Sequence, residues 1–470
     1  MRCPVFLGPV WLGLGVAILL TPPLPLDVFK VALGCEPPLE WKAGTAREVI
    51  TPRGPVWMAG YAARDRHAEG KQHELWVKGL AIESPQGKRV LLVTLDLCGV
   101  GRDLAEPLRQ EIARKTGVGF DDVMLACSHT HSGPVVGTNL ITMYRLEESD
   151  RKAIEDYTRD LTRRIAQVAE KAVGALEPCR VSWGIGEATF AVNRRENVER
   201  EVPALREQGR LKGPVDHAVP TLRVDRVSGG LAAVVMGYAC HCTTLDGYEW
   251  SGDYAGFAQL ELEQRHPDAV ALFFAGCGGD QNPIPRRSRE LAEAYGRRLA
   301  DAVDRTLSGS LTALRPEDRL TTAATTVRLD FAKVPDRAPW EALLTSPNRF
   351  EKARARALLD RLEREGRLET SAPYPIAAWR LGDLTWVFLG GEVVVDYALR
   401  LKKERGADKV WVAAYCQDVM AYIPSRRVLL EGGYEGGGAM LYYGQPSPWA
   451  ENVEETIFQG IDQVWGRLDR

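Results

Sequence analysis

The sequence predicts an α/β protein with a mixed β-sheet core flanked by helices, built as a single large domain. Strand-length apolar runs alternate with helical segments from about residue 41 to the end of the chain. Apolar residues make up 45% and charged residues 26% of the 470 residues, which is typical of a globular protein with a sizeable core. No internal repeat, low-complexity tract or clear linker follows residue 40, so one domain over 41–470 is favoured.

The first 40 residues differ from the rest of the chain. Met1-Arg2 precedes an uncharged apolar run over 4–20, and a proline-containing leader follows it. This pattern predicts an export signal, with a membrane anchor as the alternative, although about 17 residues is short for a span. Leu33-Gly34-Cys35 resembles a lipoprotein cleavage site, so lipidation at Cys35 is a third reading. We expect an exported protein (periplasmic, extracellular or lipid-anchored) whose mature chain starts between residues 20 and 40.

The predicted elements alternate through the domain. The clearest helix is 149–176, because Ile154, Leu161 and Ile165 belong to a stripe of apolar residues that recur at steps of three and four. We assign this stripe to core packing. Strands are predicted at 77–82, 89–96, 122–126, 178–185, 219–225, 231–239, 270–274, 375–380, 384–389 and 409–415. Further helices are predicted at 103–115, 254–265, 288–307 and 348–368.

Charge and cysteine content exclude several classes of protein. The 60 basic and 63 acidic residues give a net charge of −3, which does not indicate a nucleic-acid partner. The arginines of the helix 348–368 are interpreted as a solvated face rather than a phosphate site. Nine cysteines without a CxxC pair do not indicate a zinc ribbon or a dense disulfide scaffold.

The segment 127–134, Cys-Ser-His-Thr-His-Ser-Gly-Pro, is the first candidate site. It follows a predicted buried strand, and Gly133-Pro134 ends regular structure there. Residues two apart point to the same side of an extended chain, so we expect His129 and His131 to face one pocket, one as a metal ligand and the other beside it. A tight hydrogen-bonded loop is the alternative. The chain has only seven histidines, so two at one strand end favour a site.

A third histidine, His241, ends the apolar strand 231–239. Cys240 and Cys242 would point away from it on an extended chain, so a Cys-His-Cys metal cluster is disfavoured. From its position alone, metal ligation and a structural role for His241 both stay open.

Three more segments have two interpretations each. The glycine-rich segment 275–283 either presents backbone N–H groups to a ligand or forms a plain turn. Glu392 follows the strand 384–389 and is either a helix N-terminal cap or the carboxylate of a His/His/Glu zinc site. Tyr422 and Tyr434 lie in loop-like sequence, where they either pack or bind a metal or an oxyanion.

Taken together, these segments resemble the neutral/alkaline, non-lysosomal ceramidase family. The segments 128–134 and 241–244 are similar to its two histidine motifs, and Gly391-Glu392 to its Gly-Glu motif. The remaining similar motifs, in the family's order, are Asp96-Leu97-Cys98, Asn193-Arg194, Gly252-Asp253-Tyr254-Ala255-Gly256, Tyr422 and Tyr434-Glu435-Gly436. The resemblance runs from about Ala43 to Trp465 as an ordered set of motifs.

The resemblance implies an exported zinc amidohydrolase, whose α/β catalytic domain splits the N-acyl bond of ceramide into a sphingoid base and a fatty acid. Carried over residue by residue, it implies one zinc ion (Zn2+) per chain, held by His129, His241, Glu392 and Tyr422. Two imidazoles, a carboxylate and a phenolate form a coherent zinc site with room for water.

The resemblance also implies roles for residues around the metal. His131 would transfer protons and orient its neighbours, and Arg194 and Tyr434 would hold the substrate and stabilise the oxyanion. The chain has Asn282 where the family motif has a catalytic serine. Asparagine is no acyl nucleophile, but its amide donates hydrogen bonds, so Asn282 joins the catalytic candidates. Family ceramidases carry an additional C-terminal β-sandwich, and we expect 41–470 to be the catalytic domain alone.

We therefore predict a zinc-dependent hydrolase of an N-acyl (amide) bond that uses zinc-activated water. Its substrate would be a small molecule or a lipid, as in sphingolipid metabolism, with peripheral contact with a membrane. A zinc esterase is one alternative, and a non-catalytic exported metal- or lipid-binding protein on the same scaffold is another. Loss of the serine favours a binding protein, whereas retention of the four ligands and His131 favours an enzyme.

Overall fold

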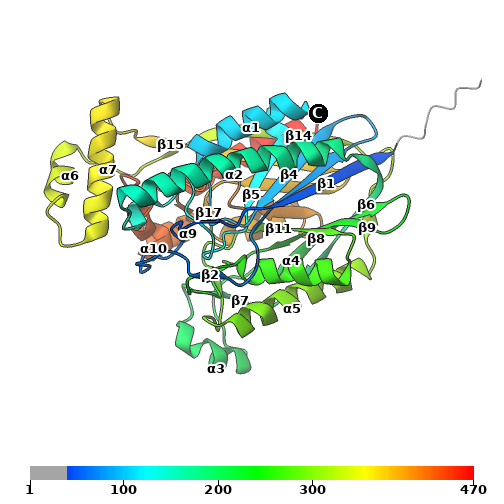
Figure 1. Cartoon of the computed structure of the whole chain (residues 1–470), viewed down its shortest axis with the longest axis horizontal. Helices are drawn as coiled ribbons and strands as arrows, with labels where there is room; N and C mark the ends of the chain where they lie inside the picture. The colour runs from blue at the N-terminus through cyan, green and yellow to red at the C-terminus, as the bar shows by residue number, and fades with distance from the viewer. Residues whose placement is uncertain (1–39) are drawn as a thin grey trace, which may run out of the picture. The chain divides into compact units, whose positions relative to one another are not determined.

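Two β-sheets pack face to face at the centre of the fold (Figure 1). The structure is a computed structural model, which describes residues 40–470. The expected export signal, membrane anchor and lipidation site lie outside these residues. The described residues form one compact unit.

The larger sheet has nine strands in the order β11-β9-β8-β6-β1-β3-β4-β5, with β13 paired to β6. The pairs β4–β5 and β9–β11 are parallel and the other pairs are antiparallel, so the sheet is mixed as predicted. Its strands are β1 (Trp41–Val49), β3 (Trp76–Glu83), β4 (Arg89–Leu95), β5 (Val123–Cys127), β6 (Glu177–Glu187), β8 (Ala218–Arg226), β9 (Leu231–Tyr238), β11 (Val270–Ala275) and β13 (Thr312–Ala313).

The smaller sheet has four strands in the order β14-β15-β16-β18. These strands are β14 (Leu320–Asp330), β15 (Ser371–Leu381), β16 (Leu384–Leu389) and β18 (Val410–Ala413). Aromatic side chains join the two sheets: Phe274 of β11 lies 4.7 Å from Trp386 of β16, and Trp183 of β6 lies 6.2 Å from Trp411 of β18, between ring centroids. Large buried rings of this kind contribute strongly to packing between sheets.

Helices cover the outer faces of both sheets and give four layers (Figure 1). α2 (Glu148–Gly174) packs on β1 and β3 beside α1 (Arg102–Thr116). α4 (Asp253–Arg265) packs on β11, and α5 (Arg289–Leu307) packs on β6 and β8. α8 (Asp396–Arg405) and α11 (Val453–Leu468) cover the smaller sheet.

Short elements complete the fold around the strand ends. The remaining α-helices of the described residues are α3 (Val202–Glu207), α6 (Arg337–Leu343), α7 (Arg349–Glu365), α9 (Arg426–Glu431) and α10 (Gly433–Gly436). The two-stranded pairs are β2 (Gly70–Lys71) with β10 (Glu249–Trp250), β7 (Ala191–Asn193) with β12 (Gln281–Pro283), and β17 (Glu392–Val393) with β19 (Tyr422–Ile423). Within residues 40–470, no helix combines the length and the apolar character that crossing a membrane requires.

The predicted fold class, a mixed sheet flanked by helices, is confirmed, and a second sheet is added to it. The strands β1 and β14 and the helix α11 were not among the predicted elements. β14 has the sequence LTTAATTVRLD, whose threonines and alanines give little apolar contrast. Glycine at position 44 of β1 is explained by close packing, since a Cβ there would lie 2.2 Å from the carbonyl oxygen of Ala172 in α2.

Candidate active site

The predicted site residues come from segments that follow the ends of strands. His129 follows β5, His241 follows β9, and Asn282 lies in β12 just after β11. Glu392 lies in β17 after β16, and the parallel pairing of β17 with β19 places Glu392 directly opposite Tyr422. Loops and short pairs at strand ends are the usual location of sites in α/β proteins.

The three histidines and Glu392 converge on one buried point. Nε2 of His129 lies 3.0 Å from Oε2 of Glu392, and Nε2 of His241 lies 3.1 Å from the same oxygen. Nε2 of His131 lies 3.1 Å from Nε2 of His129. His129, His241 and Glu392 form a buried group whose ligand atoms could hold a metal ion.

One detail of the predicted local geometry is wrong, and one of the two interpretations of Glu392 is excluded. His129 has a φ of 60°, in the left-handed region, so the backbone between the two histidines is not extended. The rings meet because this turn redirects His129 rather than because residues two apart share a face. Glu392 does not cap a helix, since it lies in β17 and α8 starts four residues later at Asp396.

The second ring nitrogen of each proposed histidine ligand is held by the backbone. Nδ1 of His129 lies 2.6 Å from the carbonyl oxygen of Cys98, and Nδ1 of His241 lies 2.7 Å from that of Gly278. A proton on Nδ1 leaves a lone pair on Nε2, and metal-binding histidines are usually oriented this way. Oε2 of Glu392 is buried and has no hydrogen-bond partner among the described residues. A cation would satisfy all three atoms, so this donor set fits a metal such as zinc.

Tyr422, the fourth predicted ligand, lies beside this group. Its hydroxyl oxygen is 3.1 Å from Nε2 of His241 and accepts a hydrogen bond from Nη2 of Arg194 at 3.0 Å. Burial raises the pKa of Tyr422 well above its usual value, with the Glu392 charge adding to the effect.

Burial and neighbouring charges set the protonation of this group. Burial lowers the pKa of His131 well below its usual value, and the charges of His129 and His241 add to this effect. Burial, followed by the Arg194 charge, lowers the pKa of His241 to about 4. Burial opposes ionisation of His129 as well, but Glu392 and Cys98 outweigh it and raise its pKa to about 10. His131 and His241 are therefore neutral at pH 7, which leaves their lone pairs available.

A cavity of about 660 Å³ opens in front of the buried group. His131, Arg194, Asn282, Tyr422 and Tyr434, all predicted from the sequence, line it. The rest of its wall is formed by Gly60, Tyr61, Arg195, Asn197, Val198, Glu199, Thr243, Ile284, Arg286, Glu431, Gly432, Gly433 and Glu435. The arginines are paired with carboxylates, since Arg194 and Arg195 bind Glu435 and Arg286 binds Glu199.

Hydrogen bonds fix the orientation of Asn282. Its Oδ1 accepts from Nη1 of Arg194 at 3.2 Å and from the hydroxyl of Thr243 at 3.3 Å. Both donors select the oxygen, so the Asn282 amide nitrogen keeps its N–H groups for a ligand in the cavity. Tyr434 is 42% exposed, and its ring lies 5.2 Å from that of Tyr422.

Three residues in contact with the buried histidine–glutamate group (His129, His241 and Glu392) were not among the predicted site residues. Tyr443 donates a hydrogen bond to Oε1 of Glu392. The ring of Tyr415 stacks on His129 with centroids 4.3 Å apart, and Sγ of Cys98 lies 3.8 Å from Nδ1 of His129. Cys98 was visible only as part of a motif, and nothing in the local sequence distinguishes either tyrosine from a packing residue.

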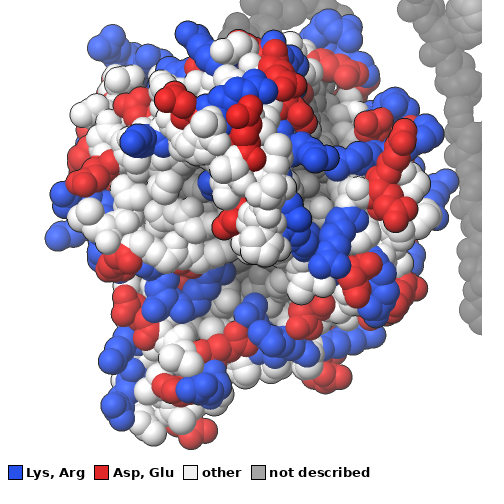
Figure 2. Space-filling view, turned by 90° about the vertical axis from the view of Figure 1, so that its left-hand side faces the viewer, with Lys and Arg blue, Asp and Glu red and all other residues white. Residues whose placement is uncertain are grey.

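Charges of both signs are interspersed on the side that carries α6 and α7. Figure 2 shows Lys and Arg side chains alternating with Asp and Glu side chains over this face. The described residues therefore form no continuous basic surface on this face, of the kind that proteins use to bind nucleic acid.

Comparison with known proteins identifies the family. The family model described as neutral/alkaline non-lysosomal ceramidase, N-terminal, matches residues 41–283, which is more than half of the chain. The chain belongs to this family. The match includes the neutral ceramidase motifs around His129, Arg194, His241 and Asn282, whereas Glu392 lies beyond it.

Neutral ceramidases of several organisms are similar to this chain at low identity. Neutral ceramidase A of Dictyostelium discoideum is 24% identical over 284 residues, which cover 56% of this chain and 39% of the relative. Neutral ceramidase of Pseudomonas aeruginosa is 23% identical over 496 residues, covering 89% of this chain and 71% of the relative. The chain thus spans less than half of the first relative's length.

Solved structures of ceramidases have the same fold. The crystal structure of the Pseudomonas aeruginosa neutral ceramidase matches with a TM-score of 0.70 at 19% identity, over 92% of this chain and 75% of the other. A ceramidase complexed with C2 matches with a TM-score of 0.68 at 18% identity, over 91% and 76% of the two chains. At this identity the match establishes the ceramidase fold.

Proposed function

We propose that this ceramidase-family protein is a zinc-dependent hydrolase of an N-acyl amide bond. The observation that carries the proposal is the convergence of Nε2 of His129 and His241 on the unpartnered Oε2 of Glu392. This buried group lies directly behind a cavity lined by polar side chains suited to bind an amide.

One zinc ion per chain would be held by His129, His241, Glu392 and Tyr422. The backbone contacts of both histidines support this assignment, because they keep Nε2 free for a ligand. A zinc ion held there supplies Lewis-acid chemistry, which acidifies water and polarises a carbonyl group.

The residues at the cavity wall would bind and orient the amide. The free N–H groups of Asn282 are suited to donate to the carbonyl oxygen as it gains negative charge. The Tyr434 hydroxyl provides a second donor from the exposed side of the cavity. Arg194 holds this arrangement together, since it binds Glu435, Tyr422, Asn282 and the carbonyl oxygen of Gly279.

His131 would transfer the proton to the leaving amine through Nε2. Its ring lines the cavity and packs edge-on against Tyr61, with centroids 4.8 Å apart. The backbone of Gly60 approaches the ring closely, because a Cβ at this position would lie 2.4 Å from Cγ of His131. A fixed imidazole beside the reacting group is the usual arrangement for proton transfer.

The substrate class follows from the family and from the cavity. The relatives are named neutral ceramidases, so a lipid amide such as ceramide is the first substrate to test. The mixed polar lining also suits shorter N-acyl amides. Export, with peripheral contact with a membrane, would bring the site to such lipids; the apolar run over 4–20 motivates this part of the proposal.

Turnover of a panel of N-acyl substrates tests the function. The panel pairs long-chain ceramides with short-chain N-acyl amides and with the matching esters, and each is assayed with zinc-loaded and with chelated protein. Amide hydrolysis that requires zinc supports the proposal, and faster ester hydrolysis would identify an esterase. Zinc binding without turnover would favour a metal- or lipid-binding protein, the function that the replacement of serine by Asn282 supports.

A further inference from the structure

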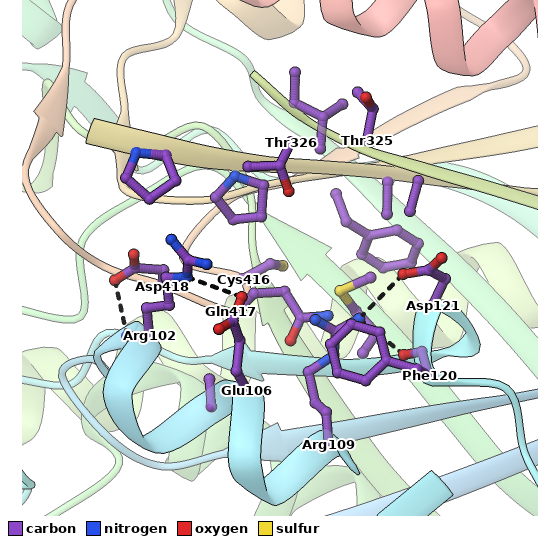
Figure 3. Close-up of a pocket in the computed structure, with 18 residues that line it drawn as sticks. Arg102, Glu106, Arg109, Phe120, Asp121, Thr325, Thr326, Cys416, Gln417 and Asp418 are labelled. Carbon is purple, nitrogen blue, oxygen red and sulfur yellow. Dashed lines mark hydrogen bonds and ion pairs between the residues drawn. The ribbon is translucent and has the colours of Figure 1, made fainter. Parts of the chain in front are cut away.

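A second cavity, of about 240 Å³, lies where the edges of the two sheets meet α1. Figure 3 shows side chains of α1 on one side and Thr325 and Thr326 of β14 on the other, with Gln417 between them. The segment Tyr415–Asp418 forms part of the wall with three of its residues, Cys416, Gln417 and Asp418. None of the residues that line this cavity lines the cavity in front of the histidines.

Gln417 offers this cavity an unused hydrogen-bond acceptor. The residue is 6% exposed, and its Nε2 donates to the carbonyl oxygen of Val123 at 2.9 Å. Its Oε1 is buried and has no partner among residues 40–470. Buried amide oxygens are normally bonded, because leaving one unpaired costs about 1–3 kcal/mol. A ligand with an N–H donor would remove this cost.

The other polar groups at the cavity also favour a donor as ligand. Asp418 is 7% exposed and receives one hydrogen bond, at 3.2 Å from the backbone N–H of Arg102. The two arginines are already bound: Arg109 donates to the carbonyl oxygens of Val123 and Phe120, and Arg102 pairs with Glu106 at 2.8 Å. Gln417 and Asp418 therefore offer acceptors to a ligand, whereas both arginine side chains are already engaged; the hydroxyl groups of Thr325 and Thr326 complete the polar wall.

The size and the apolar part of the wall limit the ligand further. Met124, Ile376, Ala377 and Phe388 line the cavity beside the polar groups. A cavity of about 150 Å³ is large enough for benzene, so 240 Å³ accommodates one ring with a small substituent. A ring that carries an amine or amidine group matches both the apolar wall and the free acceptors.

The segment Tyr415–Asp418 connects this cavity to the histidine–glutamate group. The backbone N–H of Gly391, next to Glu392, donates to the carbonyl oxygen of Asp418 at 2.7 Å. The ring of Tyr415 stacks on His129. Tyr415 and Gln417 have φ values of 57° and 66°, in a region that is costly for residues other than glycine. One four-residue segment thus reaches from the cavity to His129 and to the residue next to Glu392.

We propose that this cavity is a regulatory site for a small ring-containing amine or amidine, and that its occupation changes the affinity of the histidine–glutamate group for zinc. The binding part of the proposal does not depend on the proposed function. The regulatory part rests on the metal site proposed above, and zinc affinity is therefore measured separately from substrate turnover.

Benzamidine is the probe for binding. Titration calorimetry of the full chain should give saturable binding with a dissociation constant of the order of 1 mM. Gln417→Leu removes the free acceptor and should weaken binding by about tenfold or more. Ala324→Phe adds a ring inside the cavity and should abolish binding without removing any polar group. Gln110→Leu, the same change on an exposed residue of α1, is the matched control and should bind like the wild type.

Zinc affinity with and without benzamidine tests the regulatory part. A competing chromophoric chelator should report a severalfold change in the dissociation constant of zinc when benzamidine is present, and no change in Ala324→Phe. The proposal is overturned if benzamidine fails to bind, or if both cavity variants bind it like Gln110→Leu. An unchanged zinc affinity with benzamidine bound would overturn the regulatory part, whatever the enzyme hydrolyses.

Discussion

Tyr443 provides a direct test of the proposed zinc site, because its hydroxyl donates to Oε1 of Glu392, whereas Oε2 faces the histidines. Burial raises the pKa of Tyr443 well above its usual value, with the Glu392 charge adding to the effect, so the hydroxyl stays protonated and acts as donor. In Tyr443→Phe, Oε1 of Glu392 loses this donor while the ring is kept.

The expected loss of zinc affinity follows from this single hydrogen bond. A hydrogen bond to a charged group contributes about 1.5–3 kcal/mol, and each 1.4 kcal/mol corresponds to a factor of ten in affinity. Tyr443→Phe should therefore weaken zinc binding by about 10–100-fold, the range typical of residues that orient a metal ligand. Turnover at saturating zinc should change much less than the affinity does.

Competition with a chromophoric chelator measures the dissociation constant of zinc in each variant. Tyr442→Phe is the matched control, because the neighbouring ring packs against Phe350, with centroids 4.9 Å apart, rather than against Glu392. Wild-type affinity in Tyr443→Phe would refute the role of this hydrogen bond. An equal loss in both variants would point to general damage to the C-terminal tyrosine segment.

Three further predictions concern catalysis, processing and pH. Asn282→Ala should lower kcat by about 10²–10³-fold if the amide donates to the oxyanion, and Asn282→Ser should keep or modestly raise activity. Glu392→Gln should remove zinc and turnover together. Elemental analysis and kinetics check these three expectations. The mature protein should start between residues 20 and 40, and N-terminal sequencing that finds Met1 in native material would contradict this. Burial raises the pKa of Asp418 from 3.8 to about 7. The contribution of this carboxyl group to folded-state stability is therefore fully present below pH 3.8 and is lost as the pH rises through 7. The free energy of unfolding of Asp418→Asn in urea, relative to that of the wild type, should therefore rise by about 2–3 kcal/mol from pH 5 to pH 8. A constant difference would show that Asp418 titrates normally.

The sequence was informative wherever an apolar run ended in a residue that binds metals. His129, His241 and Glu392 each follow such a run, but their positions left His241 and Glu392 with two interpretations each. The resemblance to the ceramidase family was what predicted that the three residues meet. The contacts of Tyr443 and Tyr415 were not predictable in this way. Both contacts depend on how the smaller sheet and the C-terminal segment pack against the larger sheet. Local sequence contains no information about this tertiary packing.

The positive φ of His129 illustrates the same limit on a smaller scale. A period-of-two argument needs extended backbone, and the turn that breaks it is set by tertiary contacts, including the hydrogen bond from Nδ1 to the carbonyl oxygen of Cys98. The weakly apolar strand β14 was not predicted, because it is held in place by tertiary contacts. It packs against α11 and pairs with β15 of the smaller sheet. Periodicity detects faces that differ in polarity, and a strand of threonine and alanine has little difference to detect.

The environment of Asn282 argues for direct attack by water over an acyl-enzyme. Among the described residues, no serine or cysteine lines the cavity, and the hydroxyl of Thr243 is donated to Asn282. Ser132 and Cys277, the nearest sequence candidates for a replacement nucleophile, are both buried, and burial raises the pKa of the Cys277 thiol. Where the family motif has a serine nucleophile, this chain has the amide of Asn282, which is a hydrogen-bond donor. Arg194 and Thr243 orient this amide by donating to its Oδ1. If the proposed function holds, the described residues at this cavity would stabilise a tetrahedral oxyanion through Asn282 without forming a covalent intermediate.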